Sequence, residues 1–238
     1  MKKNSYSIIK KSILIMLPIA VLSIIFIPIR SAIFTRILLL PIERKYDIKI
    51  EFSKSTIMLS SNISMNNVSI LDKNKQLYYI GDTEIKYNAT ELLSAKKRAS
   101  FNLKRLKVYN NVRILDSVAE ILVISTLPQF EFDEIDCRAE FRRSSIYIDH
   151  LIARNNSMHV EGGGLIGKDG LLDCKLKFSF AKSVTDEIPD AIKKTLLTKE
   201  DGGWRSIKFD LTGNYKKPTL SISSSLLKLN IMEGIIGK

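Results

Sequence analysis

The chain has 238 residues, of which 45% are hydrophobic, and its formal net charge is +12. Residues 1–45 contain eight Lys and Arg and one acid, so +7 lies there, and 29 cations against 24 acids leave +5 for residues 46–238. Positive charge concentrated at one end suits membrane topology and anionic headgroups, so we expect no nucleic-acid partner. Two cysteines and two histidines are too few for a disulfide-rich scaffold or a zinc cluster.

The first predicted element is a membrane anchor. An uncharged stretch runs from Ser12 to Ile29, and at about 1.5 Å per residue it spans about 27 Å, close to the thickness of a bilayer's hydrocarbon core. The lysines before it favour a cytoplasmic N-terminus and a periplasmic location for the rest of the chain. We therefore expect a single-pass inner-membrane protein, with anchor and neck at residues 1–45 and one periplasmic domain at residues 46–238.

Two other interpretations of residues 12–29 stay open. A cleaved signal peptide would have a shorter apolar region and small residues before the cut, whereas Arg30 to Phe34 offer no clear cleavage site. A buried core helix would leave the flanking lysines unexplained. The apolar character continues from Ser31 to Leu40 and stops at Pro41, which indicates a helical neck at the membrane surface.

From Tyr46 onward the hydrophobic period changes to two, which is typical of strands with one apolar face. The alternation begins at Tyr46 to Phe52 and is clearest at Ile135 to Arg142, Cys174 to Phe180 and Ile207 to Thr212. Short strands separated by Asn, Gly and Ser turns predict a mainly β protein built as an antiparallel meander.

The apolar positions change parity at two places in the N-terminal half of the meander. Ile63 and Met65 lie on one parity and Val68 on the other, so we expect a bulge or turn at Asn66–Asn67. A second parity shift is expected before Leu106.

Helical segments are few. Ser117 and Glu120 have the spacing of a capping box at a helix start. Asp186 to Leu197 has acids at its beginning, lysines near its end and apolar residues on one face, and residues 225–238 are a third candidate. Two or three short helices are too few to cover a long apolar sheet face, unless two sheets cover each other in a sandwich.

No motif indicates an enzyme, a metal or a cofactor. Gly162 to Asp169 reads GGGLIGKD, which lacks the hydroxyl residue and the following helix that a phosphate-binding loop requires. We interpret Asp169–Gly170 as a hairpin turn instead. His150 and His159 have no partners in a catalytic pattern.

Two further groups of residues have alternative interpretations. Cys137 and Cys174 fall at apolar strand positions, and they form either two small buried thiols or one disulfide, which would require Cα atoms within about 7 Å. A basic cluster is interpreted as a solvated or lipid-facing edge; it contains Lys96, Lys97, Arg98, Lys104, Arg105 and Lys107.

The order of these features resembles the AsmA-like family. After the anchor and the strand YDIKIEF, residues 61–110 (SNISMNNVSILDKNKQLYYIGDTEIKYNATELLSAKKRASFNLKRLKVYN) are similar to the N-terminal module of that family. Residues 148–178 (IDHLIARNNSMHVEGGGLIGKDGLLDCKLKF) are similar to its C-terminal module, and Gly213 and Pro218 match its closing strand pair. Members are longer as a rule, and this chain is nearer in size to the type II secretion protein N relatives.

The resemblance implies an elongated, strongly curved β-groove whose apolar inner face takes part in moving or organising lipids between two membranes. We predict membrane lipids as partners and a role in envelope biogenesis, with a groove lining of Ile135, Phe141, Leu176, Phe178, Ile207 and Phe209. The alternative for these side chains is a closed core. The alternative function is a non-enzymatic scaffold subunit that pairs strand edges with other envelope or secretion proteins.

Overall fold

The computed structural model describes residues 32–72, 75–94, 96–109, 113–124, 131–214, 217–223 and 228–231. The predicted anchor at residues 12–29 lies outside these ranges. Within them, no helix is both long enough and apolar enough to cross a bilayer.

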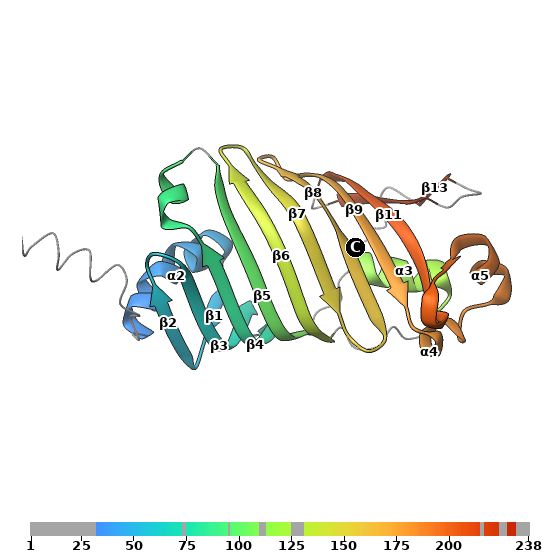
Figure 1. The fold of residues 1–238 in the computed structure, drawn as a ribbon, viewed down its shortest axis with the longest axis horizontal. Helices are drawn as coiled ribbons and strands as arrows, with labels where there is room; N and C mark the ends of the chain where they lie inside the picture. The colour runs from blue at the N-terminus through green and yellow to red at the C-terminus, as the bar shows by residue number, and fades with distance from the viewer. Residues whose placement is uncertain are drawn as a thin grey trace, which may run out of the picture.

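The described chain is mainly β, and its strands form one 13-stranded antiparallel sheet, which confirms the predicted meander (Figure 1). The sandwich alternative is wrong for the described residues, because every strand there belongs to this sheet. The strands are β1 Lys49–Glu51, β2 Lys54–Met58, β3 Asn62–Asp72, β4 Lys75–Tyr87, β5 Lys97–Val108, β6 Glu131–Arg142, β7 Ser145–Arg154, β8 Met158–Gly167, β9 Leu171–Phe180, β10 Thr198–Lys199, β11 Arg205–Asn214, β12 Lys217–Ser223 and β13 Lys228–Ile231.

Sequence neighbours pair along most of the sheet, in the order β1-β3-β4-β5-β6-β7-β8-β9-β11-β12-β13. Strand β2 also pairs with β3, and β10 pairs with β11. The part of the predicted C-terminal helix that the structure describes, Lys228–Ile231, is strand β13 instead. Its alternate apolar residues Leu229 and Ile231 lie opposite Ile222 and Leu220 of β12. The apolar residues of this segment therefore follow the two-residue period of a strand and not the period of a helix.

The described helices are α2 Ala32–Tyr46, α3 Arg113–Leu122, α4 Lys182–Thr185 and α5 Asp190–Leu196, with short 3-10 turns at Ala89–Leu93 and Asp201–Gly203. Helix α3 begins before Ser117, so the predicted capping box lies inside the helix. The segment predicted as one helix from Asp186 is interrupted, because Pro189 has no N–H to continue a helix and forms the N-cap of α5.

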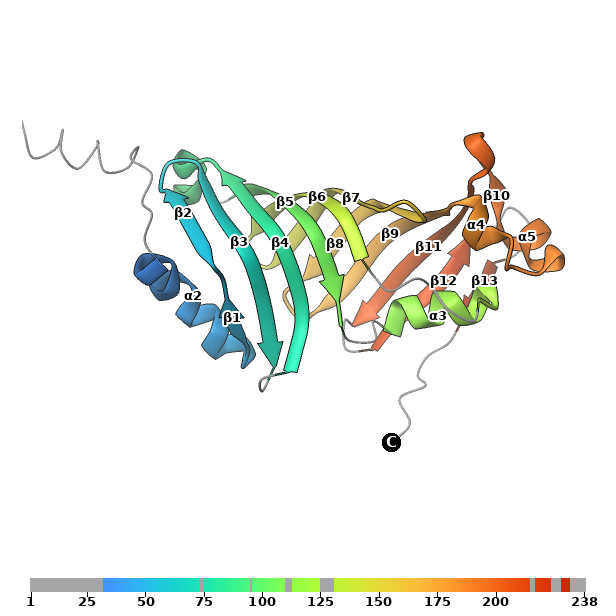
Figure 2. The same cartoon turned by 90° about the horizontal axis from the view of Figure 1, so that it is seen from below.

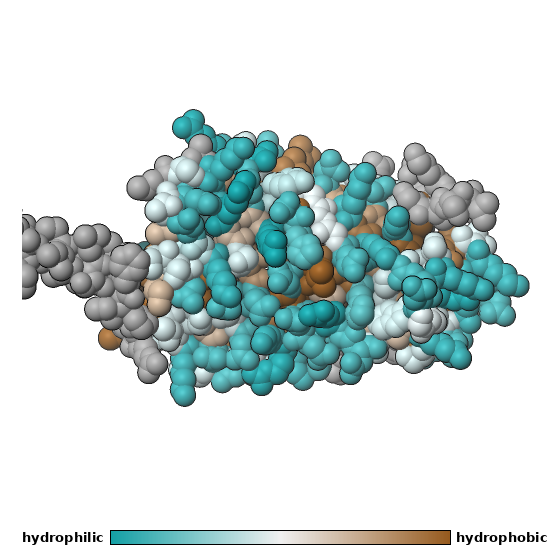
Figure 3. Space-filling model, in the orientation of Figure 1, coloured by the Kyte–Doolittle hydropathy of each residue, from teal (hydrophilic) through white to brown (hydrophobic). Residues whose placement is uncertain are grey.

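The sheet is arched, and the helices are not spread evenly over it (Figure 2). Helix α3 lies under the half that contains β9 to β12, whereas α2 lies beside β1 and β2 at the other end, and α4 and α5 lie beyond β11 (Figures 1 and 2). The face turned toward the viewer in Figure 1 is predominantly hydrophilic (Figure 3). We call it the polar face, and the opposite one the apolar face.

Two buried clusters lie on the apolar face. One joins α3, through Val118 and Leu122, to β9, β11 and β12, and it extends along the same edge to buried residues of β6, β7 and β8. The other gathers Ile50, Met65, Val68 and Ile80 from β1, β3 and β4, with Leu39 of α2 packed against it. Leu106 of β5 contacts both clusters, so the apolar face is continuous from one end of the described sheet to the other.

The predicted parity shift in β3 is confirmed, and it coincides with a row of irregular residues that runs across β3, β4 and β5. Asn67 and Arg105 have positive φ values of 49° and 56°. The residues before and after them are paired across β3, β4 and β5, so Asn67, Gly81 and Arg105 lie side by side on these three strands. The register is the same on both sides of this row, so no residue is inserted and the irregularity is a change of backbone conformation, not the expected bulge or turn. Met65 and Val68 are buried on the same face although they are three residues apart, so the row returns the apolar residues to the apolar face.

A second irregularity lies where β7, β8 and β9 meet. The register of β7 shifts between Ile148 and Leu151, opposite the glycines of β8. Gly164 has a φ of 150°, and a Cβ atom there would overlap the backbone of Asp173 and Cys174 on β9. Only glycine fits this close approach between strands.

We therefore expect Gly164→Ala to lower the free energy of unfolding by about 2 kcal/mol or more, because it combines backbone strain with a steric overlap. Gly167→Ala is the matched control on the same strand. Its Cβ would lie 3.5 Å from the Cβ of Leu171, an ordinary contact, and we expect a change within about 0.5 kcal/mol. Urea unfolding followed by circular dichroism measures both, and equal losses would contradict this account.

Candidate functional site

The most unusual surface of the described sheet is a set of apolar side chains on the apolar face of β5 to β9. All of them are half-buried, in contrast to the adjoining buried clusters. We call this set the apolar floor; it consists of Phe101, Leu103, Ile135, Cys137, Phe141, Ile146, Ile148, Leu151, Ile166, Leu172 and Leu176.

Strand pairing aligns the apolar floor in rows that cross the sheet. One row places Phe101 opposite Cys137 and Cys137 opposite Leu151, then continues through Gly162 to Leu176. Gly162 has no side chain to fill its place in the row. A Cβ there would come within 2.8 Å of Cδ2 of Leu176, so Leu176 leans over β8. Glycine thus lets neighbouring strands approach closely in the middle of the floor.

The six residues predicted to line a groove all lie on the apolar face, but they divide into two groups. Ile135, Phe141 and Leu176 belong to the half-buried apolar floor, where Ile135 and Leu176 also pack against the edge of the cluster that includes α3. Phe178, Ile207 and Phe209 are only 2%, 2% and 1% exposed and lie in the cluster that includes α3.

The buried group forms a closed core. The rings of Phe178 and Phe209 meet edge to face with centroids 5.3 Å apart, a favourable geometry for buried aromatic pairs. The closed-core alternative therefore describes these two residues and Ile207, whereas the apolar floor is the surface on which a ligand could lie. The floor residues on β7, such as Ile146 and Leu151, were not predicted, because the bulge in β7 hides their alternation.

Of the two alternatives for Cys137 and Cys174, the structure has two separate thiols and no disulfide. Both cysteines are free thiols, and they lie on β6 and β9, three strands apart. At about 4.8 Å per strand this separation is about 14 Å, beyond the reach of a disulfide. Burial raises the pKa of both thiols, so they are neutral at pH 7. Cys174 is buried, as the thiol alternative expects, and Cys137 is half-buried.

The polar face carries ion pairs that neutralise much of its charge. The Glu140 carboxylate accepts hydrogen bonds from Nε of Arg142 at 2.7 Å and from Nε of Arg98 at 3.3 Å. Hydrogen bonding to Arg142 holds the pKa of Glu140 below its ordinary value, although burial opposes the shift. In the predicted basic cluster, Arg98 therefore has an acidic partner.

Two other cations of that cluster are paired as well. Arg105 lies 3.0 Å from Asp82, and Lys107 lies 2.7 Å from Glu131. The six residues extend along β5 and the turn before it, so they do not form one compact patch. Three of them pair with the acids Glu140, Asp82 and Glu131. A solvated face is the interpretation that these contacts favour.

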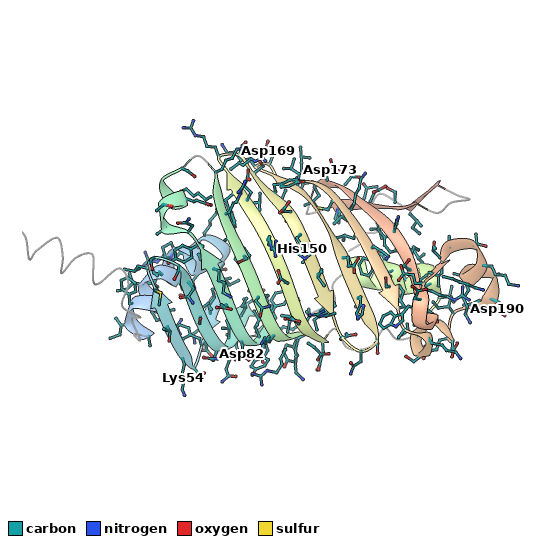
Figure 4. All side chains as sticks on the ribbon, viewed as in Figure 1. Lys54, Asp82, His150, Asp169, Asp173 and Asp190 are labelled. Carbon is teal, nitrogen blue, oxygen red and sulfur yellow. The ribbon has the colours of Figure 1, made fainter. Side chains whose placement is uncertain are left out.

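The two histidines lie on separate strands, and neither is part of a recognisable acid–base pair. His150 lies on β7 in the middle of the polar face, opposite Arg138 (Figure 4). His159 stacks on Trp204, with ring centroids 4.3 Å apart. Among the described residues, no group of three or more His, Cys, Asp and Glu side chains is placed to hold a metal ion.

The glycine-rich segment is a strand and a turn, as predicted. Gly162 to Gly167 belong to β8, and the N–H of Gly170, with a φ of 76°, donates to the carbonyl of Gly167 at 3.0 Å. The chain then enters β9, so no helix N-terminus follows that could bind phosphate.

A polar hollow of about 520 Å³ lies on the polar face beside β10, with His159, Lys177, Glu200 and Trp204 among its lining residues. Nζ of Lys177 lies 2.5 Å from Oε1 of Glu200. Burial alone would raise the pKa of Glu200, but hydrogen bonds from Lys177, Ser206 and Ser179 outweigh it and keep the pKa below its ordinary value. The charged carboxylate thus fastens the β10 hairpin to the sheet.

Comparison of the chain with protein-family models, with characterised proteins and with solved structures gives no match. The resemblance to the AsmA-like family therefore stays a prediction that rests on the sequence features quoted above.

We expect Phe209→Ala to lower the free energy of unfolding by about 3 to 5 kcal/mol, because it leaves a cavity in the closed core. Phe141→Ala removes the same ring from the half-buried floor, and the loss should be about half as large. Urea unfolding of the two variants compares them directly. Equal losses would show that the floor is as enclosed as the core.

The pKa of Glu200 also predicts a pH dependence of stability. A carboxylate with a depressed pKa stabilises the fold above its unfolded-state pKa, and this contribution disappears as the pH falls through the folded-state value. Glu200→Gln should therefore cost about 1 to 3 kcal/mol at pH 7, and the difference from the unchanged chain should shrink below about pH 4.3. Denaturant titrations at several pH values test this, and a constant difference would refute it.

Proposed function

We propose that the chain is a membrane-anchored module that binds lipids, or transfers them, on the apolar floor of its arched sheet. The observation that carries the proposal is the half-buried apolar surface of β5 to β9, which adjoins the two buried clusters of the same sheet face. Sheet faces of this kind are normally buried against another layer. An acyl chain is a suitable covering for an apolar surface without polar side chains.

The dimensions of the apolar floor support this choice of ligand. Five adjacent strands at about 4.8 Å spacing give a floor about 19 Å across, comparable with a fatty acyl chain. Each methylene removed from water on such a surface contributes about 0.8 kcal/mol, so partial coverage of one chain is sufficient for binding. The ion pairs of the opposite face keep that side in water while the headgroup remains outside the floor.

The apolar stretch at residues 12–29 supplies the second argument. An anchor there would hold the sheet beside a lipid reservoir, with the N-terminus cytoplasmic and the sheet in the periplasm. A role in organising or moving lipids of the cell envelope follows from this placement and from the resemblance to AsmA-like proteins. The proposal requires no catalytic group, metal ion or cofactor.

The proposal is tested by placing a charge on either face of the sheet. Phe141 of β6 belongs to the apolar floor, whereas Tyr147 of β7 is exposed on the polar face, where Cζ of Arg142 lies 5.6 Å from its ring centroid. We expect Phe141→Asp to lower the affinity for a fluorescent phospholipid about tenfold or more, because the ring's contribution is lost and a carboxylate resists burial. Tyr147→Asp should bind as the unchanged chain does.

Lipids that remain bound after native extraction are identified by mass spectrometry, and circular dichroism confirms that both variants are folded. The proposal fails if the delipidated full chain takes up neither fatty acid nor phospholipid. It also fails if the two substitutions reduce uptake equally, since binding would then not depend on the apolar floor.

A further inference from the structure

Helix α2 exposes an unusual number of large apolar side chains for a helix on the surface of a water-soluble domain. Five large aliphatic side chains of α2 are exposed: Ile33 by 75%, Ile37 by 57%, Ile42 by 44%, Leu38 by 43% and Leu40 by 41%. A surface helix normally turns such residues toward the core. Concentrated exposed apolar area of this kind marks a surface that binds a partner or a membrane.

The polar side chains of α2 instead attach it to the sheet. Oγ1 of Thr35, which is 2% exposed, donates to Oγ of Ser55 on β2 at 2.7 Å. Nη1 of Arg36 donates to Oε1 of Glu43 at 3.0 Å and to the carbonyl of Ile50 at 2.5 Å. The N–H of Ile50 returns a hydrogen bond to Glu43 at 2.7 Å.

These contacts form a closed network between α2 and β1, which we call the α2 latch and define as Arg36, Glu43 and the backbone of Ile50. Charge-assisted hydrogen bonds of this kind are stronger than neutral ones, and the Glu43 side chain is only 13% exposed. The guanidinium of Arg36 also lies 5.4 Å from the ring centroid of Phe52. The latch therefore determines which side of α2 is turned away from the sheet.

We infer that the exposed aliphatic side of α2 is embedded in the bilayer surface and that the bilayer boundary lies at Arg44 and Lys45. The helix has 15 residues with basic side chains in its last turn, where cations reach lipid headgroups. It follows the apolar stretch 12–29 after only Arg30 and Ser31. At 15 residues, α2 is shorter than the roughly 20 residues that cross a bilayer, and the sheet contacts hold it beside the domain, so it lies at the bilayer surface.

This placement, which rests on the proposed function, seats the β1–β3 end of the sheet against the lipid. The cluster of Ile50, Met65, Val68 and Ile80 beside α2 continues through Leu103 to the apolar floor. An acyl chain that leaves the bilayer at α2 thus meets apolar side chains along the way. The bilayer is the occupant that we assign to α2, in preference to a second copy of the chain, because the apolar sequence continues directly from the predicted anchor.

The experiment uses the single tryptophan of the chain, Trp204. In a full-length Trp204→Phe background, Ile37→Trp places a reporter on α2, and Tyr147→Trp places a matched reporter on the exposed polar face. Both chains are reconstituted in vesicles of phosphatidylethanolamine and phosphatidylglycerol with brominated acyl chains. We expect the bromines to quench about half or more of the emission of Ile37→Trp, because an interfacial helix lies about 5 to 10 Å deep, and to leave Tyr147→Trp nearly unchanged.

The possible outcomes separate this inference from the proposed function. If the chain sediments with the vesicles but Ile37→Trp is no more quenched than Tyr147→Trp, the inference about α2 is overturned and the anchor stands. Blue-shifted emission without quenching, together with cross-linking between copies, would assign α2 to a second copy and also overturn it. A chain that does not sediment with vesicles would contradict both the anchor and the inference.

Discussion

One constraint governs the described structure: a single arched sheet has a continuous apolar face and too little helix to cover it. Alternation along each strand places polar side chains on one face and apolar side chains on the other. Helix α3 closes the face over β9 to β12, and Leu39 of α2 packs over the β1–β4 end. The apolar floor lies between them, and it is the reason that we assign a lipid as ligand.

The irregular residues of the sheet maintain this division of faces. Alternation alone would point residues of one parity to one face along the whole strand, whereas a bulge or a residue of irregular conformation changes the parity that reaches that face. The row through Asn67, Gly81 and Arg105 shifts the parity in three strands at one level. The bulge in β7 faces the glycines of β8 in the same way. Backbone strain at a few positions thus keeps the apolar floor continuous.

Membrane attachment and lipid binding would share one physical basis in this molecule. The latch of Arg36, Glu43 and the Ile50 backbone turns the aliphatic side of α2 away from the sheet, and the apolar floor begins within the cluster that Leu39 of the same helix contacts. Polar contacts hold the helix to the domain, so its apolar residues are left for the bilayer. The opposite arrangement would bury those residues in the core and separate the sheet from the lipid.

Side-chain alternation and turn residues are sufficient to predict the fold class, the shared face of the six lining residues, the parity shift at Asn66–Asn67 and the hairpin turn after Gly167. These features are local, because each depends on side-chain alternation or on turn residues within about ten positions. The packing of distant elements makes Phe178, Ile207 and Phe209 closed core and leaves Ile135, Phe141 and Leu176 half-buried. The tertiary structure also places Cys137 and Cys174 too far apart to bridge, and it turns the aliphatic side of α2 outward. Burial depends on which distant element packs on a given strand, and alternation within that strand carries no information about this.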